Sequence, residues 1–247
     1  GVFMTTDRVN HFLFKDYERD GENKEAFVDF YRKVDDYIGR IREMLGDDVT
    51  LVVASDHGFT SLDYEVHCNA WLQEEGWLSF EDDDHDDLTD IAEESRAYSL
   101  IPGRFYINLE GREPRGSVPE DEYEETRAEL KAALEALEGP DGKKVCARVV
   151  EKEDAFRGAH DDIAPDLVAI PNHGFDLKSG FKGHDEVFDV GPRNGMHSFD
   201  NATLFVDDPS VSITDADLFD IAPTILDLMD IDYGRTDFDG GSLVTSK

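Results

Sequence analysis

Residues 50–59 read TLVVASDHGF, and this stretch decides the expected fold. Its first half, Thr50 to Ala54, is short, β-branched and uninterrupted by charge, as in a central strand of a parallel sheet that is covered on both faces. Ligands of such sheets gather beyond the carboxyl ends of the strands. We therefore expect Asp56 and His57 at a site, with Gly58 after them helping to expose both side chains at the end of the sheet.

The segments before this strand predict another strand and a helix. Residues 1–6 (GVFMTT) are short and apolar, which is typical of the last part of a buried strand. From Phe27 to Leu45, apolar side chains recur every three or four positions, as on one face of an amphipathic helix, and Gly46 ends the run. The order strand, helix, strand predicts an α/β fold, a mostly parallel sheet with helices on both faces.

The rest of the chain is expected to continue as α/β structure. Strands are expected at residues 104–109, 143–150, 166–170 and 202–206, and helices at residues 69–75, 119–138 and 220–229. Residues 81–94 form a charge run typical of a solvated surface, and residues 171–196 lack periodicity, which predicts a long loop. We expect one α/β domain over residues 1–247, with a smaller α+β region inserted within residues 81–195.

The charge balance excludes several kinds of partner. The 247 residues include 24 Lys and Arg against 58 Asp and Glu, a formal net charge of −34. Nucleic acid and anionic membrane surfaces would be repelled by this field, because binding to them requires clustered cations. Hydrophobic residues nevertheless make up 39% of the chain, enough for a folded core. Molar salt would screen the self-repulsion, so the composition favours a halophilic protein over a merely acidic one.

Cysteine usage and hydropathy bear on the location of the protein. Cys68 and Cys146 lack the CxxC spacing, so the sequence indicates neither a disulfide framework nor a cysteine zinc site. No apolar run approaches the ~18 residues that a membrane span needs, and the first residues lack the charged region of a signal peptide. These features predict a cytoplasmic protein and leave its oligomeric state open.

Two carboxylates and three imidazoles stand out as candidate metal ligands. They occur in Asp7-x-x-x-His11, in the pair Asp56-His57, and at His197 within the sequence GMHS. On a helix, residues four apart lie on one face, so Asp7 and His11 could reach one ion. Oxygen and nitrogen ligands without thiolate suit Zn²⁺, and also Mn²⁺ or Fe²⁺, and five ligands exceed one tetrahedral shell. By spacing alone, an ordinary surface pair is the favoured interpretation of the first motif. For the second motif, a helix cap beside a hydrogen-bonded histidine and a metal site are about equally favoured.

The order of these motifs resembles the alkaline phosphatase superfamily. More narrowly, it is similar to the type I phosphodiesterase/nucleotide pyrophosphatase branch and the related predicted phosphohydrolase/phosphomutase group. The matching stretches cover nearly the whole chain in order: TTDRVNHF (5–12), ASDHGF (54–59), YINLEGREPRG (106–116), APDLV (164–168) and DIAPTIL (220–226). One departure is Ser198, which follows the last histidine where many relatives have Gly.

The resemblance implies a two-metal site. Asp7, His11 and His197 would hold one ion, and Asp56 and His57 would hold a second, with zinc as the expected metal and manganese as the alternative. It further implies hydrolysis of a small-molecule phosphoester, of the phosphodiesterase or phosphatase type, through a phosphorylated Ser or Thr.

The resemblance also implies that part of the catalytic domain is missing. In the family, the nucleophile and a further Asp ligand precede the first motif. The chain is therefore expected to be the C-terminal portion of the catalytic domain, without the N-terminal strand and the nucleophile region. This leaves the catalytic nucleophile unknown and the activity of this chain alone open.

Two other functions are weighed against hydrolysis. A phosphomutase of the cofactor-independent phosphoglycerate mutase kind shares the first two motifs. Its final histidine lies close behind Asp-His, whereas His197 comes 197 − 57 = 140 positions after His57, which favours the hydrolase branch. A non-catalytic metal-binding fragment would bind an ion without hydrolysis. Arg104, Arg112 and Arg193 could contact phosphate, although salt bridges on an acidic surface are the favoured interpretation for each.

Overall fold

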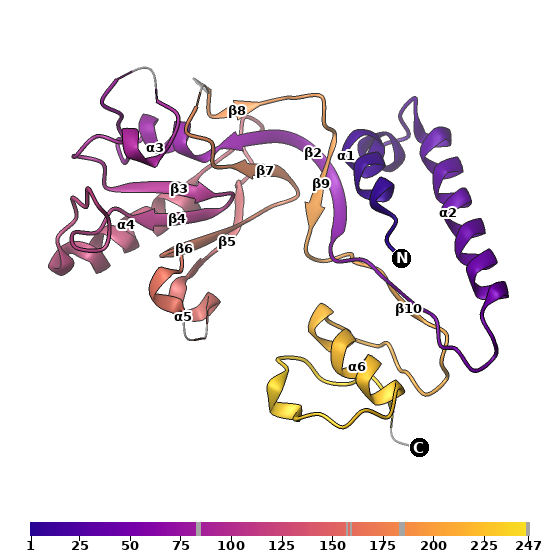
Figure 1. Cartoon of the computed structure of the whole chain (residues 1–247). Coiled ribbons are helices and arrows are strands. Elements are labelled where there is room, and N and C mark those ends of the chain that lie inside the picture. The colour runs from indigo at the N-terminus through magenta and orange to yellow at the C-terminus, as the bar shows by residue number, and fades with distance from the viewer. Residues whose placement is uncertain (83–84, 157, 159, 183–185, 246–247) are drawn as a thin grey trace. The chain divides into compact units, whose positions relative to one another are not determined.

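A computed structural model describes residues 1–82, 85–156, 158, 160–182 and 186–245 of the chain (Figure 1). The chain divides into two compact units. Unit 1 contains residues 1–9, 16–59 and 197–247, and unit 2 contains residues 10–15 and 60–196. The expected single domain with an insertion within residues 81–195 stays a prediction.

Unit 1 is built from helices and a short ribbon. Its helices are α1 (Met4–Glu18), α2 (Lys24–Met44) and α6 (Ile221–Leu228), although residues 10–15 of α1 belong to unit 2. β1 (Val52–Ala54) pairs with β10 (Leu204–Val206) in an antiparallel ribbon. Tyr17 of α1 stacks on Phe27 of α2 with ring centroids 4.7 Å apart, and this contact packs the two helices together.

Two expectations for unit 1 are wrong. Residues 1–6 do not end a strand, because helix α1 already begins at Met4. Residues 50–54 are not a central strand of a parallel sheet, because β1 pairs antiparallel with β10 and is only half-buried. A short apolar run predicts a strand but does not identify the strand beside it, since that partner comes from a distant part of the chain. The helices expected at residues 27–45 and 220–229 and the strand expected at 202–206 are confirmed.

Unit 2 is built around two four-stranded sheets. In the first, the order is β3-β4-β6-β5 and all neighbours are antiparallel. In the second, β2 lies between β7, which is parallel to it, and β8, which is antiparallel, and β9 also pairs with β2. The bounds are β2 (Gly58–His67), β3 (Ala97–Ile101), β4 (Arg104–Ile107), β5 (Cys146–Glu151), β6 (Leu167–Pro171), β7 (Gly174–Lys178), β8 (Phe188–Asp189) and β9 (Gly195–Ser198).

Among the residues that the structure describes, the remaining elements are three helices of unit 2 and several 3-10 helices. The helices are α3 (Cys68–Glu74), α4 (Tyr123–Ala136) and α5 (Lys152–Ala155). The 3-10 helices are η1 (Leu88–Asp90), η2 (Glu120–Glu122), η3 (Asp161–Ile163), η4 (Leu218–Asp220) and η5 (Arg235–Asp237). Leu130 and Leu134 of α4 pack with Phe105, Leu167 and Phe175 from the strands, and all five are at most 1% exposed, so this is the core of unit 2.

The predicted mostly parallel sheet is wrong, because the strand pairings described are mostly antiparallel. The connection from β3 to β4 shows the reason. Only Pro102 and Gly103 separate the two strands, and so short a connection joins antiparallel neighbours, whereas a parallel pair needs a long crossover. Gly103 has φ +71, the left-handed conformation that the third position of a type II turn after Pro requires.

Most elements expected in unit 2 are confirmed with shifted ends, but the expected loop is not. α3, α4, β4, β5 and β6 all lie within a few residues of the predicted segments. Residues 171–196 contain β7, β8 and the start of β9 instead of one long loop. These strands are five residues long or shorter, so alternation along each is too brief to stand out from the surrounding Gly and Asp.

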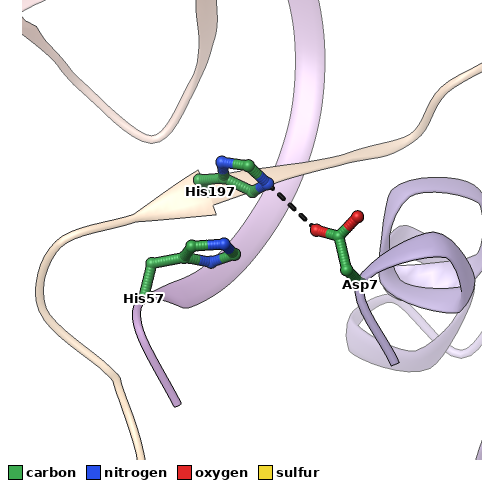
Figure 2. A group of neighbouring side chains, drawn as sticks. All are labelled: Asp7, His57 and His197. Carbon is green, nitrogen blue, oxygen red and sulfur yellow. Dashed lines mark hydrogen bonds and ion pairs between the residues drawn. The ribbon is translucent and has the colours of Figure 1, made fainter. Parts of the chain in front are cut away.

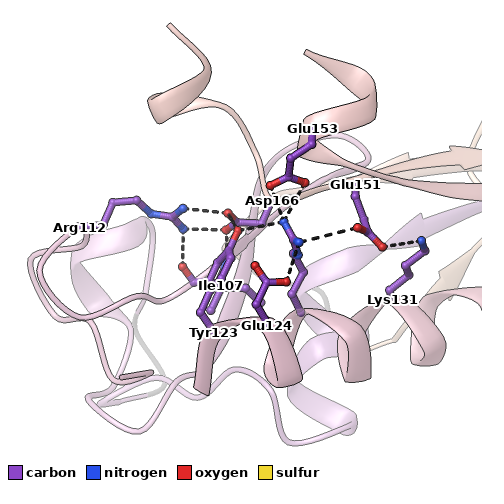
Figure 3. A network of polar contacts seen from close by, with 9 residues as sticks. Ile107, Arg112, Tyr123, Glu124, Lys131, Glu151, Glu153 and Asp166 are labelled. Atoms are coloured by element: carbon purple, nitrogen blue, oxygen red, sulfur yellow. Dashed lines mark hydrogen bonds and ion pairs between the residues drawn. The ribbon is translucent and has the colours of Figure 1, made fainter. Parts of the chain in front are cut away.

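A buried ion pair ties the strands of unit 2 to α4 and to the segment after β4 (Figure 3). The carboxylate of Asp166 is fully buried, and it accepts two hydrogen bonds from the guanidinium of Arg112 at 2.8 and 2.6 Å. It also accepts the Tyr123 hydroxyl at 2.6 Å and the Ile107 backbone N–H at 2.7 Å. Burial would raise the pKa of Asp166, but these donors outweigh it and hold the pKa below its usual value. Arg112 therefore forms a salt bridge, as expected, but with a buried carboxylate and not on the acidic surface. The Arg104 guanidinium donates a hydrogen bond to the Pro102 carbonyl at 3.2 Å.

This network predicts a pH-dependent effect of Tyr123→Phe. The variant removes one donor to an ionised, buried carboxylate, so we expect the free energy of unfolding to fall by about 1.5–3 kcal/mol near neutral pH. Because the folded pKa of Asp166 is lowered, the stabilisation is present above the unfolded pKa, near 3.8, and is lost as pH falls through the folded pKa. The difference in the free energy of unfolding between the variant and the wild type should therefore become smaller as urea unfolding is measured from pH 7 down to pH 2.

Tyr64→Phe is the matched control for this measurement. Tyr64 also lies in unit 2, and its ring stacks on Phe175 with centroids 6.0 Å apart, a contact that Phe retains. The difference in the free energy of unfolding between Tyr123→Phe and the wild type could instead stay constant over this pH range. That result would show that the hydroxyl does not act through the charge of Asp166.

Candidate functional site

Three of the five candidate ligands meet in unit 1 (Figure 2). Asp7 lies in the first turn of α1, His57 lies between β1 and β2, and His197 lies in β9. Each contributes one ligand atom, and these atoms all lie within 4.8 Å of one another. Segments that are far apart in the sequence thus bring a carboxylate and two imidazoles to one place.

The geometry of this group is tight. Nε2 of His197 lies 3.1 Å from Oδ1 of Asp7, and the rings of His57 and His197 stack with centroids 3.8 Å apart at 26°. The side chains of Asp7, His57 and His197 are 44%, 28% and 52% exposed, so the group is open to solvent.

The donor set fits a divalent transition metal. Two imidazole nitrogens and one carboxylate oxygen are ligands of open Zn²⁺ sites, in which a further position stays available for water or substrate. With metal–ligand bonds of ~2.0–2.1 Å, neighbouring ligands on a tetrahedral ion lie ~3.3 Å apart. The 3.1 Å between His197 and Asp7 is close to that spacing. Nδ1 of His57 lies 3.1 Å from the Gly58 carbonyl, and if it carries the proton, it donates there and leaves Nε2 as the ligand atom.

The ribbon β1–β10 positions the loop that holds His57. Beyond the strand pairs, Ser55 N–H donates to the Thr203 carbonyl at 2.9 Å, and Thr203 N–H donates to the Ser55 hydroxyl at 2.8 Å. The ribbon pairing thus extends up to the residue before Asp56. Asp56 itself is 84% exposed, and its Oδ1 lies 3.6 Å from Nε2 of His57, so it lies beside the group without belonging to it.

His11 is the fifth candidate, and its ring is engaged within unit 2. It lies on α1 four positions after Asp7, as the spacing predicts. Its Nδ1 lies 2.9 Å from the Gly195 carbonyl, and the tautomer that donates this proton leaves Nε2 as the ligand atom. Gly195 permits the close approach, because a Cβ there would lie 2.2 Å from the Asn10 carbonyl oxygen. The structure does not include His11 in the group of three.

A second group of possible ligands lies in unit 2, and the sequence analysis missed it. Glu65, His67 and Asp189 place one ligand atom each within 4.8 Å of the others. The alternation of Glu65 and His67 on β2 could have indicated a shared face, but Asp189 falls within the segment interpreted as a loop. Glu65 already accepts hydrogen bonds from the guanidinium of Arg193, one of them at 3.0 Å. The salt bridge expected for Arg193 is thereby confirmed. The positive charge beside this second group of possible ligands is the guanidinium of Arg193.

Comparison with known proteins identifies one family. The family model for type I phosphodiesterase / nucleotide pyrophosphatase matches residues 1–200, a range that includes Asp7, His57 and His197. No curated protein and no solved structure matches the chain. Among the residues that the structure describes, no helix has the length and apolar character needed to cross a membrane.

Proposed function

The chain belongs to the type I phosphodiesterase/nucleotide pyrophosphatase family, and from this premise we propose that it carries out metal-dependent hydrolysis of phosphate esters. The family consists of phosphoric ester hydrolases that act on small phosphoesters and are generally metal-dependent. The observation that carries the proposal is the convergence of Asp7, His57 and His197, because these residues supply the ligand types that such chemistry requires.

We propose that Asp7, His57 and His197 hold a divalent cation, with zinc as the expected metal and manganese as the alternative. A bound cation of this kind supplies Lewis-acid stabilisation of charge on the phosphoryl oxygens. Asp56 and His11 stay predicted ligands. The resemblance assigns Asp7 and His57 to different ions, so a second ion beside the first, with Asp56 and His57 as its ligands, stays a prediction.

The residues of this chain have binding and orienting roles in the proposed reaction. His57 and His197 would each offer a ring nitrogen to the cation, and the Asp7 carboxylate adds the negative charge that favours a cation over an anion at the site. We propose that a Ser or Thr hydroxyl supplied by residues preceding Gly1 attacks phosphorus as the ester P–O bond breaks and the alcohol leaves. Water then attacks the same phosphorus and displaces the Ser or Thr oxygen, which regains its proton. This step releases phosphate from a monoester substrate or a phosphomonoester from a diester, so both steps balance without another reactant.

Turnover measurements test this proposal. The chain is assayed alone and within a longer protein that also carries the proposed nucleophile region, with p-nitrophenyl phosphate and bis-p-nitrophenyl phosphate in molar KCl. We expect p-nitrophenol release by the longer protein that EDTA abolishes and Zn²⁺ or Mn²⁺ restores. Phosphate released to water indicates a hydrolase, whereas a phosphoryl group returned to a phosphoglycerate indicates a mutase. Metal binding without turnover of any phosphoester would overturn the enzymatic proposal.

We also propose that the protein works at high salt, inside a salt-rich cytoplasm. The support is the formal net charge of −34, because the Debye length falls from about 10 Å at 0.1 M salt to about 3 Å at 1 M. Thermal unfolding in 0.1 M and 2 M KCl tests this, and we expect the midpoint to rise in the higher salt. If the midpoint is equal or lower in 2 M KCl, the protein is merely acidic.

A further inference from the structure

We propose that Asn201 is a positioning residue that holds the segments bearing His57 and His197 together, an inference that rests on the proposed metal site. Asn201 lies four positions after His197, and Phe59 lies two positions after His57. The side chain of the first is hydrogen-bonded to the backbone of the second, so one amide links the two segments that supply the imidazoles. All of these residues belong to unit 1.

The amide of Asn201 satisfies both backbone groups of Phe59. Its Oδ1 accepts the Phe59 N–H at 3.0 Å, and its Nδ2 donates to the Phe59 carbonyl at 2.7 Å. This pair of bonds reproduces the exchange that two residues make across antiparallel strands. The Ser198 hydroxyl also donates to Oδ1, so the acceptor atom of the amide is held from a second direction. The orientation of the amide is therefore determined by three hydrogen bonds.

Gly58 makes this contact possible. A Cβ at position 58 would lie 1.6 Å from Oδ1 of Asn201 and 2.7 Å from Oγ of Ser198. No side chain fits in that space unless the amide leaves Phe59. Gly58 directly follows His57, so the close packing occurs at the residue next to a proposed ligand.

Phe59 transmits the contact to both imidazoles. The residue is 6% exposed, and its ring lies edge-on to the ring of His197 at a centroid distance of 5.1 Å and 5.6 Å from the ring of His57. A displacement of Phe59 would therefore change the surroundings of both rings. By this argument Asn201 acts on the site through Phe59 rather than by contact with metal or substrate.

Two measurements on Asn201→Ala test the inference, one with a metal and one without. Co²⁺ serves as the probe, because its visible absorption reports coordination as well as binding. Loss of an outer residue that orients metal ligands typically weakens metal affinity by about 10–100-fold, and we expect a loss in this range together with a changed Co²⁺ spectrum. In the metal-free protein, we expect the NMR signals of the His57 and His197 rings to shift, while those of His173 in unit 2 stay in place.

Matched variants separate positioning from general stability. Asn172→Ala removes another side-chain amide, which donates to the Lys144 carbonyl at 2.9 Å in unit 2, and should leave Co²⁺ affinity unchanged. Asn201→Asp retains an acceptor for Phe59 N–H but loses the donor, and should weaken Co²⁺ binding less than Asn201→Ala does. In Gly58→Ala, the added Cβ should displace the amide of Asn201. This variant should therefore shift the NMR signals of the His57 and His197 rings even if Asn201→Ala does not fold.

The possible outcomes distinguish this inference from the proposed function. Unchanged histidine signals and unchanged Co²⁺ affinity in Asn201→Ala and Gly58→Ala would overturn the role of Asn201. If wild type binds no Co²⁺ but the two variants still shift the His57 and His197 signals, the metal site is wrong and the positioning role stands. An equal loss of Co²⁺ affinity in Asn172→Ala would show a general loss of stability and would also overturn the inference.

Discussion

His197→Ala is expected to lower kcat/KM for p-nitrophenyl phosphate esters by about a thousandfold in the protein that carries the nucleophile. The proposed cation would contribute several kcal/mol of charge stabilisation in the transition state, and about 4 kcal/mol corresponds to a factor of a thousand. Nε2 of His197 lies 3.1 Å from the Asp7 carboxylate, so the variant removes one of the three grouped ligands and leaves the carboxylate without that neighbour. The measurement is initial rates at several Zn²⁺ concentrations.

Asp7→Asn and His173→Ala complete this test. Asp7→Asn keeps the shape of the side chain but removes its charge, so we expect a loss similar in size to that of His197→Ala. His173 is an exposed histidine of unit 2 outside the group, and its replacement should change the rate by less than about twofold. If His197→Ala retains the rate of the wild type at saturating Zn²⁺, the three grouped residues are not the metal site of the enzyme.

Asp166→Ala is expected to reduce the free energy of unfolding by about 3–5 kcal/mol, the typical cost of removing one partner from a buried ion pair. The variant leaves the guanidinium of Arg112 without its carboxylate and also removes the acceptor of the Tyr123 hydroxyl and the Ile107 N–H. Groups from the segment after β4, from α4 and from β4 itself thus lose their shared partner. Urea unfolding of unit 2, followed by Trp71 and Trp77 fluorescence, measures the change.

Glu129→Ala is the control for the buried ion pair. Glu129 accepts a hydrogen bond from Arg96 at 2.9 Å, but the two side chains are 52% and 42% exposed. Water screens such a pair, and we expect a loss of at most about 1 kcal/mol. If Asp166→Ala and Glu129→Ala reduce the free energy of unfolding equally, burial does not increase the contribution of the Asp166 network to stability.

Local structure could be read from the sequence where one segment carries its own signal. The spacing from Phe27 to Leu45 predicts α2, and the Pro119 start and Gly139 end bracket α4, because helix periodicity and end signals depend only on nearby residues. Strand pairing depends on two distant segments. The run at residues 50–54 therefore predicts β1 but not its antiparallel partner β10.

For the candidate site as well, the sequence predicted what a single segment carries but not what depends on distant segments. The motifs and the family resemblance singled out five candidate ligands, and the structure brings the ligand atoms of three of them, Asp7, His57 and His197, within 4.8 Å of one another. His11 and Asp56 lie outside that group. Which of the candidate ligands come together in one group was not predictable, because that depends on how β9 and the loop after β1 lie beside each other. Asn201 was missed altogether. A lone Asn four residues after a histidine carries no pattern of its own, and its role becomes visible only through its bonds to Phe59.

The enclosure of Asp166 has a consequence for how the protein responds to dissolved ions. Its carboxylate is 0% exposed, so K⁺ and Cl⁻ cannot come between it and Arg112, and this attraction should be equally strong in dilute buffer and in brine. The many carboxylates on the surface are exposed to solvent, so the repulsion between them does depend on the salt concentration. On dilution, the first parts to loosen should therefore be peripheral segments rich in Asp and Glu, while the interior around Arg112 stays closed.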